Sequence, residues 1–198
     1  MHPDWDRYRA DFPNRYWNTG VFDDTLRSFL RQQAPTKIVD IGGGAFGTEA
    51  LKEAHCPVFL LDPYVSTLPS WMSGRMNWGD HLHFDLAVAR GSINYFTDTQ
   101  FAQLRGMLRP KGRVIANTFL TAPSVQWRKR MVVNGAGEEG TEWVRLHNNR
   151  VEHVLEYSSR RIEHHFYFRS QDEFDRLLPG CRFIQHGENS FTLFWEAP

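Results

Sequence analysis

Cysteine is scarce in this sequence, the charges balance, and long apolar runs are missing. Cys56 and Cys181 are the only cysteines among 198 residues. Two cysteines make no disulfide framework, and these two lack the close spacing of a zinc site. We therefore expect a protein of a reducing compartment, the cytoplasm.

Neither sign of charge is in excess, because lysine plus arginine and aspartate plus glutamate each number 23. Proteins that follow nucleic-acid phosphates usually carry a basic surplus, so no nucleic-acid partner is expected. No segment approaches the roughly 18 apolar residues of a membrane helix, and the polar, acidic start is unlike a secretory signal. Aromatic residues are plentiful at 14%, which suits either a flat apolar ligand or a well-filled core.

Strand and helix patterns alternate over the first 120 residues. Apolar, β-branched runs predict buried strands at 37–41, 57–61, 84–89 and 112–119, with a short strand near 75–78. Helical spacing predicts helices over 22–30, 45–54 and 98–108. This alternation is typical of an open, mostly parallel sheet, and so predicts a Rossmann-like α/β domain covering 1–198.

The pattern changes to an alternation of period two over 141–169. Asn148-Asn149 and Ser158-Ser159 are plausible two-residue hairpin turns, so the segment predicts a three-stranded antiparallel insert. We expect this insert to act as a lid and residues 1–20 to form an N-terminal cap. Ser170 followed by Glu173 predicts a capping box, after which two strands, 181–187 and 190–195, close the chain.

A glycine-rich turn follows the first predicted strand. Gly42, Gly44 and Gly47 form the pattern G-x-G-x-x-G, and Asp62 ends the next strand 20 positions after Gly42. This fingerprint is ambiguous between a dinucleotide and another adenosyl ligand. Asp40, just before the turn, would repel a pyrophosphate and attract a ligand that carries an ammonium and a sulfonium, such as S-adenosylmethionine. An NAD-dependent oxidoreductase and a non-catalytic adenosyl-binding module remain the alternatives.

The order of these motifs resembles the class I S-adenosylmethionine-dependent methyltransferases, in particular their small-molecule branch. The resemblance is carried by Val39–Gly44, Leu60–Asp62, Phe84–Arg90 and Leu108–Ile115, and it covers about Thr36 to Trp195. It implies an antiparallel last strand and transfer of a methyl group to an N or O atom of a small molecule. Ile93–Phe96 does not supply the Asn-Pro-Pro-aromatic tetrad of enzymes that methylate nucleobase or protein amide nitrogens.

The resemblance also assigns residues to the cofactor. Asp62 would hold the ribose hydroxyls, and the backbone of the glycine turn would approach the methionine part. Pro63 would line the adenine, Asp80 would meet its amine, and the backbone near Arg90 would face the amino-acid end. The full cofactor set is Asp40, Gly42, Gly43, Gly44, Asp62, Pro63, Asp80, Ala89 and Arg90.

Candidates for the methyl acceptor come from the strand ends and from the N-terminal aromatic residues. Ligands bind beyond the carboxyl ends of strands in open α/β sheets, which favours Arg90 and Tyr95. Tyr16 and Trp17 would be suited to enclose a cationic centre, or would be ordinary core residues.

Two histidines are the candidate catalytic residues. If Ser158-Ser159 is a two-residue turn, His153 pairs with His164 on an otherwise apolar face. The pair would serve as a general base or bind the acceptor, or its imidazoles would simply pack on aromatic rings. Two histidines without a nearby carboxylate or cysteine fall short of a metal site, so no metal is expected.

Overall fold

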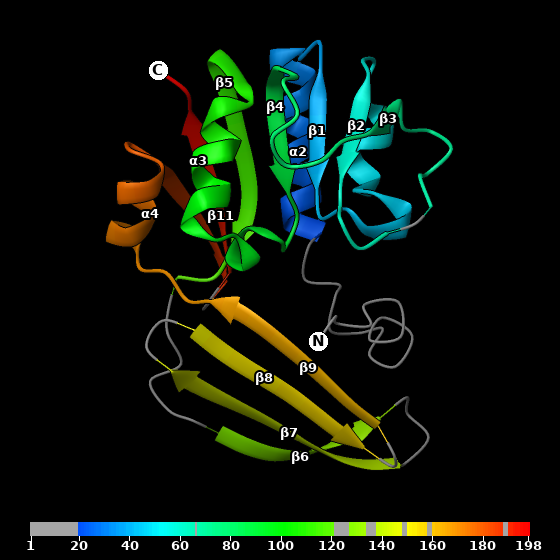
Figure 1. Cartoon of the computed structure of the whole chain (residues 1–198), viewed down its shortest axis with the longest axis vertical. Coiled ribbons are helices and arrows are strands. Elements are labelled where there is room, and N and C mark those ends of the chain that lie inside the picture. Colours follow the sequence, from blue (N-terminus) through cyan, green and yellow to red (C-terminus); the bar gives the residue numbers. More distant parts are fainter. Residues whose placement is uncertain are drawn as a thin grey trace. The chain divides into compact units, whose positions relative to one another are not determined.

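Figure 1 shows the chain as a computed structural model, which describes residues 20–65, 67–120, 127–133, 138–147, 150–157, 160–187 and 190–198. The chain divides into two compact units. The first, which we call the parallel-sheet unit, comprises 19–120 and 169–198, and the second, the insert unit, comprises 1–18 and 121–168. Tyr16, Trp17 and nearly all of the predicted cap over 1–20 lie outside the described residues.

The parallel-sheet unit contains a seven-stranded sheet in the order β10-β11-β5-β4-β1-β2-β3. Its strands are β1 (Ile38–Ile41), β2 (Val58–Leu61), β3 (Gly74–Arg75), β4 (Phe84–Ala89), β5 (Leu108–Thr118), β10 (Arg182–Gly187) and β11 (Ser190–Glu196). Strands β1 to β5 pair in parallel, whereas β11 is antiparallel to both β5 and β10. The predicted Rossmann-like sheet with an antiparallel last strand is therefore confirmed.

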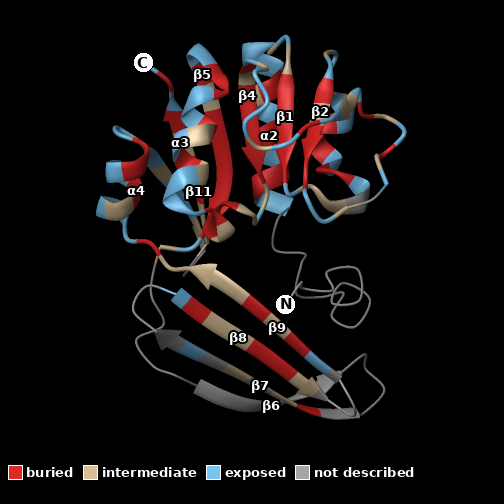
Figure 2. Cartoon of the chain, in the orientation of Figure 1, coloured by how far each residue is buried: buried red, intermediate tan, exposed pale blue. Residues whose placement is uncertain are grey.

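Helices cover both faces of this sheet, which explains why its central strands are buried (Figures 1 and 2). Along β4, Leu86 and Val88 belong to one core cluster, and Ala87 and Ala89 to the other, because successive side chains alternate between faces. Helix α2 (Gly20–Gln33) packs into the cluster of Leu86. Helices α3 (Asp98–Gly106) and α4 (Gln171–Leu177) pack into the other cluster.

Three predicted elements of this unit need correction. The predicted helix over 45–54 is instead two short 3-10 segments, η2 (Gly44–Phe46) and η3 (Glu49–Glu53). The left-handed backbone of Gly47, at φ +70°, separates them. The strand expected near 75–78 is only the two residues of β3, and the helix expected to reach 108 ends at Gly106.

The insert unit contains a four-stranded antiparallel sheet in the order β6-β7-β8-β9. Its strands are β6 (Trp127–Val133), β7 (Glu138–His147), β8 (Arg150–Tyr157) and β9 (Arg160–Tyr167). The predicted three-stranded insert is present as β7 to β9, and β6 is a fourth strand that the prediction missed. The register places Tyr157 opposite Arg160 and His153 opposite His164, as the two-residue turn predicts.

Candidate active site

The carboxyl ends of β1, β2 and β4 bring the predicted cofactor residues to one edge of the parallel sheet. Gly42 donates its backbone N–H to Leu61 O at 2.9 Å, which joins the start of the glycine turn to the end of β2. Gly42 and Gly44 have φ values of +72° and +70°, a conformation that glycine adopts at little cost. A Cβ on Gly42 would lie 2.5 Å from the Cβ of Ser92, so the segment after β4 packs directly on this turn.

Asp40 lies beneath the glycine turn, where it binds Thr48. The Asp40 carboxylate is fully buried and accepts hydrogen bonds from Thr48 N at 2.7 Å and Thr48 Oγ1 at 2.8 Å. A Cβ on Gly43 would collide with Asp40 Oδ2. Burial raises the pKa of Asp40 to about 6, although the two bonds from Thr48 and the charge of Arg90 act against that rise. Asp40 thus fastens the turn through Thr48, and its expected attraction for a cationic ligand stays a prediction.

Asp62 presents its carboxylate where β2 meets the glycine turn. Its Oδ2 accepts the Gly44 N–H at 3.0 Å, and its Oδ1 accepts the Tyr64 N–H at 2.9 Å. Each carboxylate oxygen has a second lone pair, so both remain able to accept a hydroxyl. Tyr64 is two residues after Asp62 and is 60% exposed. Phe46 is two residues after Gly44, whose N–H Asp62 accepts, and is 64% exposed.

The other predicted cofactor and acceptor residues that the structure describes follow the ends of strands or lie at them. Pro63 is exposed beside Asp62, and Ala89 is buried at the end of β4. Asp80 is exposed and accepts the Asn77 N–H at 2.8 Å in the turn after β3. Tyr95 is half-buried in a short 3-10 segment, η4 (Ile93–Tyr95).

An ion pair at the same edge was missed by sequence reasoning. Arg90 Nη2 lies 3.0 Å from Asp23 Oδ2, and both side chains are mostly buried. Burial raises the pKa of Asp23, while the positive charge of Arg90 opposes the rise. The sequence signal for Asp23 was only its place in the first turn of a helix, where an acid is common.

His153 and His164 face each other across β8 and β9, with ring centroids 5.5 Å apart. His164 is 2% exposed. Burial, together with the smaller effects of the nearby His153 and His165, lowers the pKa of His164 to about 3. His164 is therefore a neutral imidazole at ordinary pH. The facing arrangement is confirmed, whereas a catalytic role for the pair stays a prediction.

His165 lies on the opposite face of the insert sheet. It pairs in register with Glu152 and hydrogen-bonds to Glu163 at 2.7 Å. One donor atom from each of these three side chains lies within 4.8 Å of the others. Because Glu163 is already shared with His165 and Arg161, this cluster reads as a surface ion-pair network.

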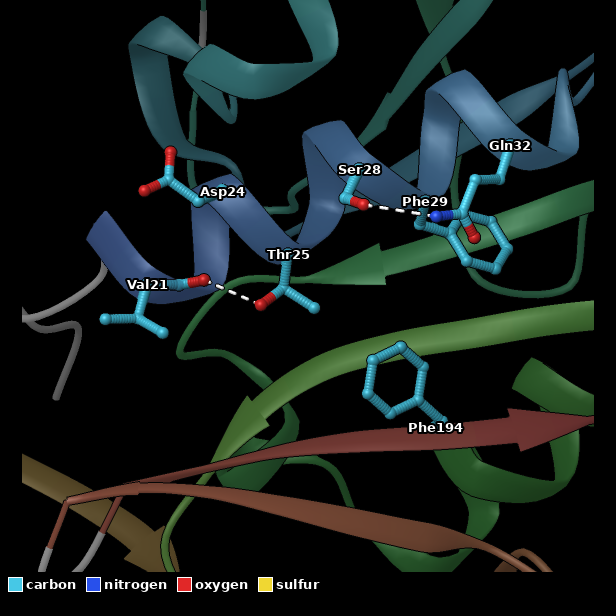
Figure 3. Close-up of a pocket in the computed structure, with 7 residues that line it drawn as sticks. All are labelled: Val21, Asp24, Thr25, Ser28, Phe29, Gln32 and Phe194. Carbon is cyan, nitrogen blue, oxygen red and sulfur yellow. Dashed lines mark hydrogen bonds between the residues drawn. The ribbon is translucent and has the colours of Figure 1, made fainter.

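A shallow groove elsewhere on the parallel-sheet unit offers little chemistry (Figure 3). It lies between α2 and β11, and its lining is Val21, Asp24, Thr25, Ser28, Phe29, Gln32 and Phe194. Thr25 and Gln32 are hydrogen-bonded within the helix, and Asp24 forms an ion pair with Arg27. The lining contains no histidine or cysteine, and its single carboxylate, Asp24, is exposed and paired, so the strand ends remain the candidate site.

No helix in the described part of the chain is both long and apolar enough to span a membrane. No family model matches the chain, and no curated protein matches it significantly.

Solved structures with the same fold are S-adenosylmethionine-dependent methyltransferases. One from Clostridium acetobutylicum has a TM-score of 0.69 at 12% identity and covers 96% of this chain and 94% of its own. A sugar N-methyltransferase from Streptoalloteichus has a TM-score of 0.68 at 11% identity, covering 100% and 95%. An amino pentose methyltransferase from Micromonospora echinaspora, bound to S-adenosylmethionine, has a TM-score of 0.62 at 14% identity, covering 96% and 95%. The chain therefore has the fold that these methyltransferases share.

Proposed function

We propose that this protein is an S-adenosylmethionine-dependent methyltransferase that acts on an N or O atom of a small molecule. The observation that carries the proposal is the edge of the sheet where Asp62, the Gly42–Gly44 turn and the end of β4 converge. This edge is where open α/β sheets bind their ligands. The buried Asp23 Oδ1, which has no hydrogen-bond partner among the described residues, supports a ligand with a donor group here.

The residues present fit this cofactor by charge and by shape. Asp62 would accept hydrogen bonds from the ribose hydroxyls, and the turn at Gly42–Gly44 would let the backbone come close to the ligand. Phe46 and Tyr64 offer exposed aromatic surface for an adenine, next to Pro63. When bound, the cofactor would supply an electrophilic methyl group on its sulfonium. The chain's own task would then be to align the acceptor and exclude water.

Two solved structures of the same fold guide the choice of acceptor, since one is a sugar N-methyltransferase and the other an amino pentose methyltransferase. Amino sugars are therefore the first acceptors to test. An amine acceptor needs no strong base once it is neutral. A hydroxyl acceptor would need one, and the facing pair His153 and His164 is our candidate, with His153 taking the proton because burial keeps His164 neutral. We keep the cytoplasm as the expected compartment, since Cys56 and Cys181 are both free.

Isothermal titration calorimetry with S-adenosylhomocysteine, the demethylated product, tests cofactor binding. We expect the wild type to bind. Asp62→Asn should lower the affinity about 10- to 100-fold, because the charged group that accepts the two ribose hydroxyls becomes neutral. Asp175→Asn is the matched control, because Asp175 also accepts a backbone N–H, from Gly180 at 2.7 Å, but lies on α4. The control should bind like the wild type.

The same titrations separate the competing functions. Tight binding of NADH without binding of S-adenosylhomocysteine would favour an oxidoreductase and reject the methyltransferase. Release of S-adenosylhomocysteine in the presence of amino sugars would support catalysis. A protein that holds the cofactor but never turns it over, with amine and hydroxyl acceptors alike, would instead be an adenosyl-binding module.

A further inference from the structure

The ion pair between Asp23 and Arg90 lies at the edge where the glycine turn begins. Asp23 is in the first turn of α2, and Arg90 is the first residue after β4. Two residues later, Ser92 donates its hydroxyl to Ile41 O at 2.5 Å, which holds this segment against the end of β1. The pair is therefore fixed beside the turn by contacts between residues that are far apart in sequence.

One oxygen of this pair lacks a donor. Asp23 Oδ2 binds Arg90, but Asp23 Oδ1 is buried and no donor reaches it within the described part of the chain. Buried carboxylate oxygens are normally hydrogen-bonded, so an exception calls for an explanation such as a ligand. An ammonium group would satisfy the oxygen, because it offers three N–H donors.

Another buried arginine of the unit is held by contacts within the core. Arg169 donates to Phe96 O at 2.7 Å, lies 3.3 Å from Asp98 and stacks over the Phe101 ring. Those contacts tie the start of α4 to α3 within the core. Arg90 differs, because its guanidinium is held by a carboxylate at a strand end, in the region where ligands bind in this fold.

The charges at this edge complement an amino-acid group. The two residues after each of β1, β2, β4 and β5 form the rim of this edge, and among them only Arg90 carries a positive charge. Asp23, Asp40 and Asp62 supply negative charge nearby, and Arg90 is close enough to Asp40 to influence its titration. A ligand end that carries both a carboxylate and an ammonium would match this arrangement.

We propose that Asp23 and Arg90 together recognise the amino-acid end of the cofactor. The Arg90 guanidinium binds the carboxylate of that end, and Asp23 Oδ1 accepts a hydrogen bond from its ammonium. Asp23 also positions Arg90 through their ion pair at 3.0 Å. This inference rests on the proposed function, and it adds that selectivity for the intact amino-acid end resides in this pair.

The test compares two ligands by calorimetry on the wild type and on variants. S-adenosylhomocysteine carries the amino-acid end, whereas 5′-methylthioadenosine lacks it. We expect Arg90→Gln to weaken S-adenosylhomocysteine by about 10-fold or more, because a charge-assisted contact is lost. Asp23→Asn should weaken it by roughly 3- to 10-fold, because Asn keeps the shape but not the charge. Binding of 5′-methylthioadenosine should stay within about 2-fold in both variants, since it makes no contact with the pair.

The double variant Asp23→Asn/Arg90→Gln removes both charges and so leaves no buried charge without a partner. It should show the same selective loss. Arg109→Gln is the matched control, because Arg109 pairs with Asp85 at the same 3.0 Å at the other end of β4. It should bind both ligands like the wild type.

Two kinds of failure are distinguishable. Equal weakening of both ligands, or no weakening of either, would show that the pair is only structural and would overturn this inference while leaving the proposed function intact. A wild type that binds neither ligand, yet keeps a folded circular-dichroism spectrum, would overturn the proposed function and this inference with it.

Discussion

The two units each bury a titratable side chain in a sheet, and burial acts on the two groups in opposite directions. In the parallel-sheet unit, burial raises the pKa of Asp40 to about 6. In the insert unit, burial lowers the pKa of His164 to about 3. Burial disfavours the charged form in both cases, so the acid keeps its proton to higher pH and the imidazole loses its proton to lower pH.

The neighbours of the two groups differ as well. Asp40 is surrounded by groups that favour its charge, namely the two hydrogen bonds from Thr48 and the guanidinium of Arg90, while Asp62 disfavours it. His153 and His165 both disfavour a charge on His164. The difference teaches that Asp40 is built to hold a loop in place, whereas His164 is built to stay neutral.

The largest expected effect on the pH dependence of stability comes from replacing His164. His164 is neutral when folded and becomes charged when unfolded below about pH 6.5, so it stabilises the fold above that pH, and this stability is lost as pH falls toward 3. In the wild type, His164 should lower the free energy of unfolding by on the order of 4 kcal/mol between the two ends of this window, and His164→Phe should remove that change. Urea unfolding followed by tryptophan fluorescence from pH 3.5 to 7 measures it. An unchanged slope would contradict the low pKa.

The acid should show the opposite slope. The folded pKa of Asp40 lies above its unfolded value of 3.8, so the stability it contributes is present below pH 3.8 and is lost as pH rises through about 6. The free energy of unfolding of Asp40→Asn minus that of the wild type should therefore be about 3 kcal/mol more positive at pH 7 than at pH 4. The same unfolding series checks this. If Asp40→Asn and His164→Phe change the slope in the same direction, the comparison between the two units fails.

The smallest effect sharpens the account of Asp40. Thr48→Val keeps the shape of the side chain but removes the hydroxyl bond of 2.8 Å to Asp40. We expect a loss of about 1 to 2 kcal/mol at pH 7, where Asp40 is charged, and a smaller loss at pH 4. Thr25→Val is the control, because the Thr25 hydroxyl donates to a backbone carbonyl, Val21 O, and not to a titratable group. A loss that does not vary with pH would mean that Thr48 acts by packing alone.

Local patterns allowed much of the fold to be predicted. β4 has the predicted bounds, because its apolar run has no competing signal. The capping box of Ser170 and Glu173 is present with both of its hydrogen bonds. The facing of His153 and His164 followed from one turn length, since register in a hairpin is fixed by its loop.

The remaining features depend on contacts between distant residues. Asp23 and Arg90 are 67 positions apart, so no local spacing indicates their pairing. The direction of the Asp40 side chain depends on where Thr48 lies, and the predicted helix over 45–54 gave way to the turn that Thr48 helps to close. β6 was missed because the basic run within 128–130 obscured its alternation.

Arg169 stands where the chain re-enters the parallel-sheet unit, and its guanidinium is fixed to Phe96 O and Asp98. The point of departure, at the end of β5, is equally secured by the β4 and β11 ladders. Both junctions are thus anchored independently of the 48 residues between them, 121–168. Such a scaffold tolerates changes of length and sequence in the intervening segment without losing the fold of the parallel sheet.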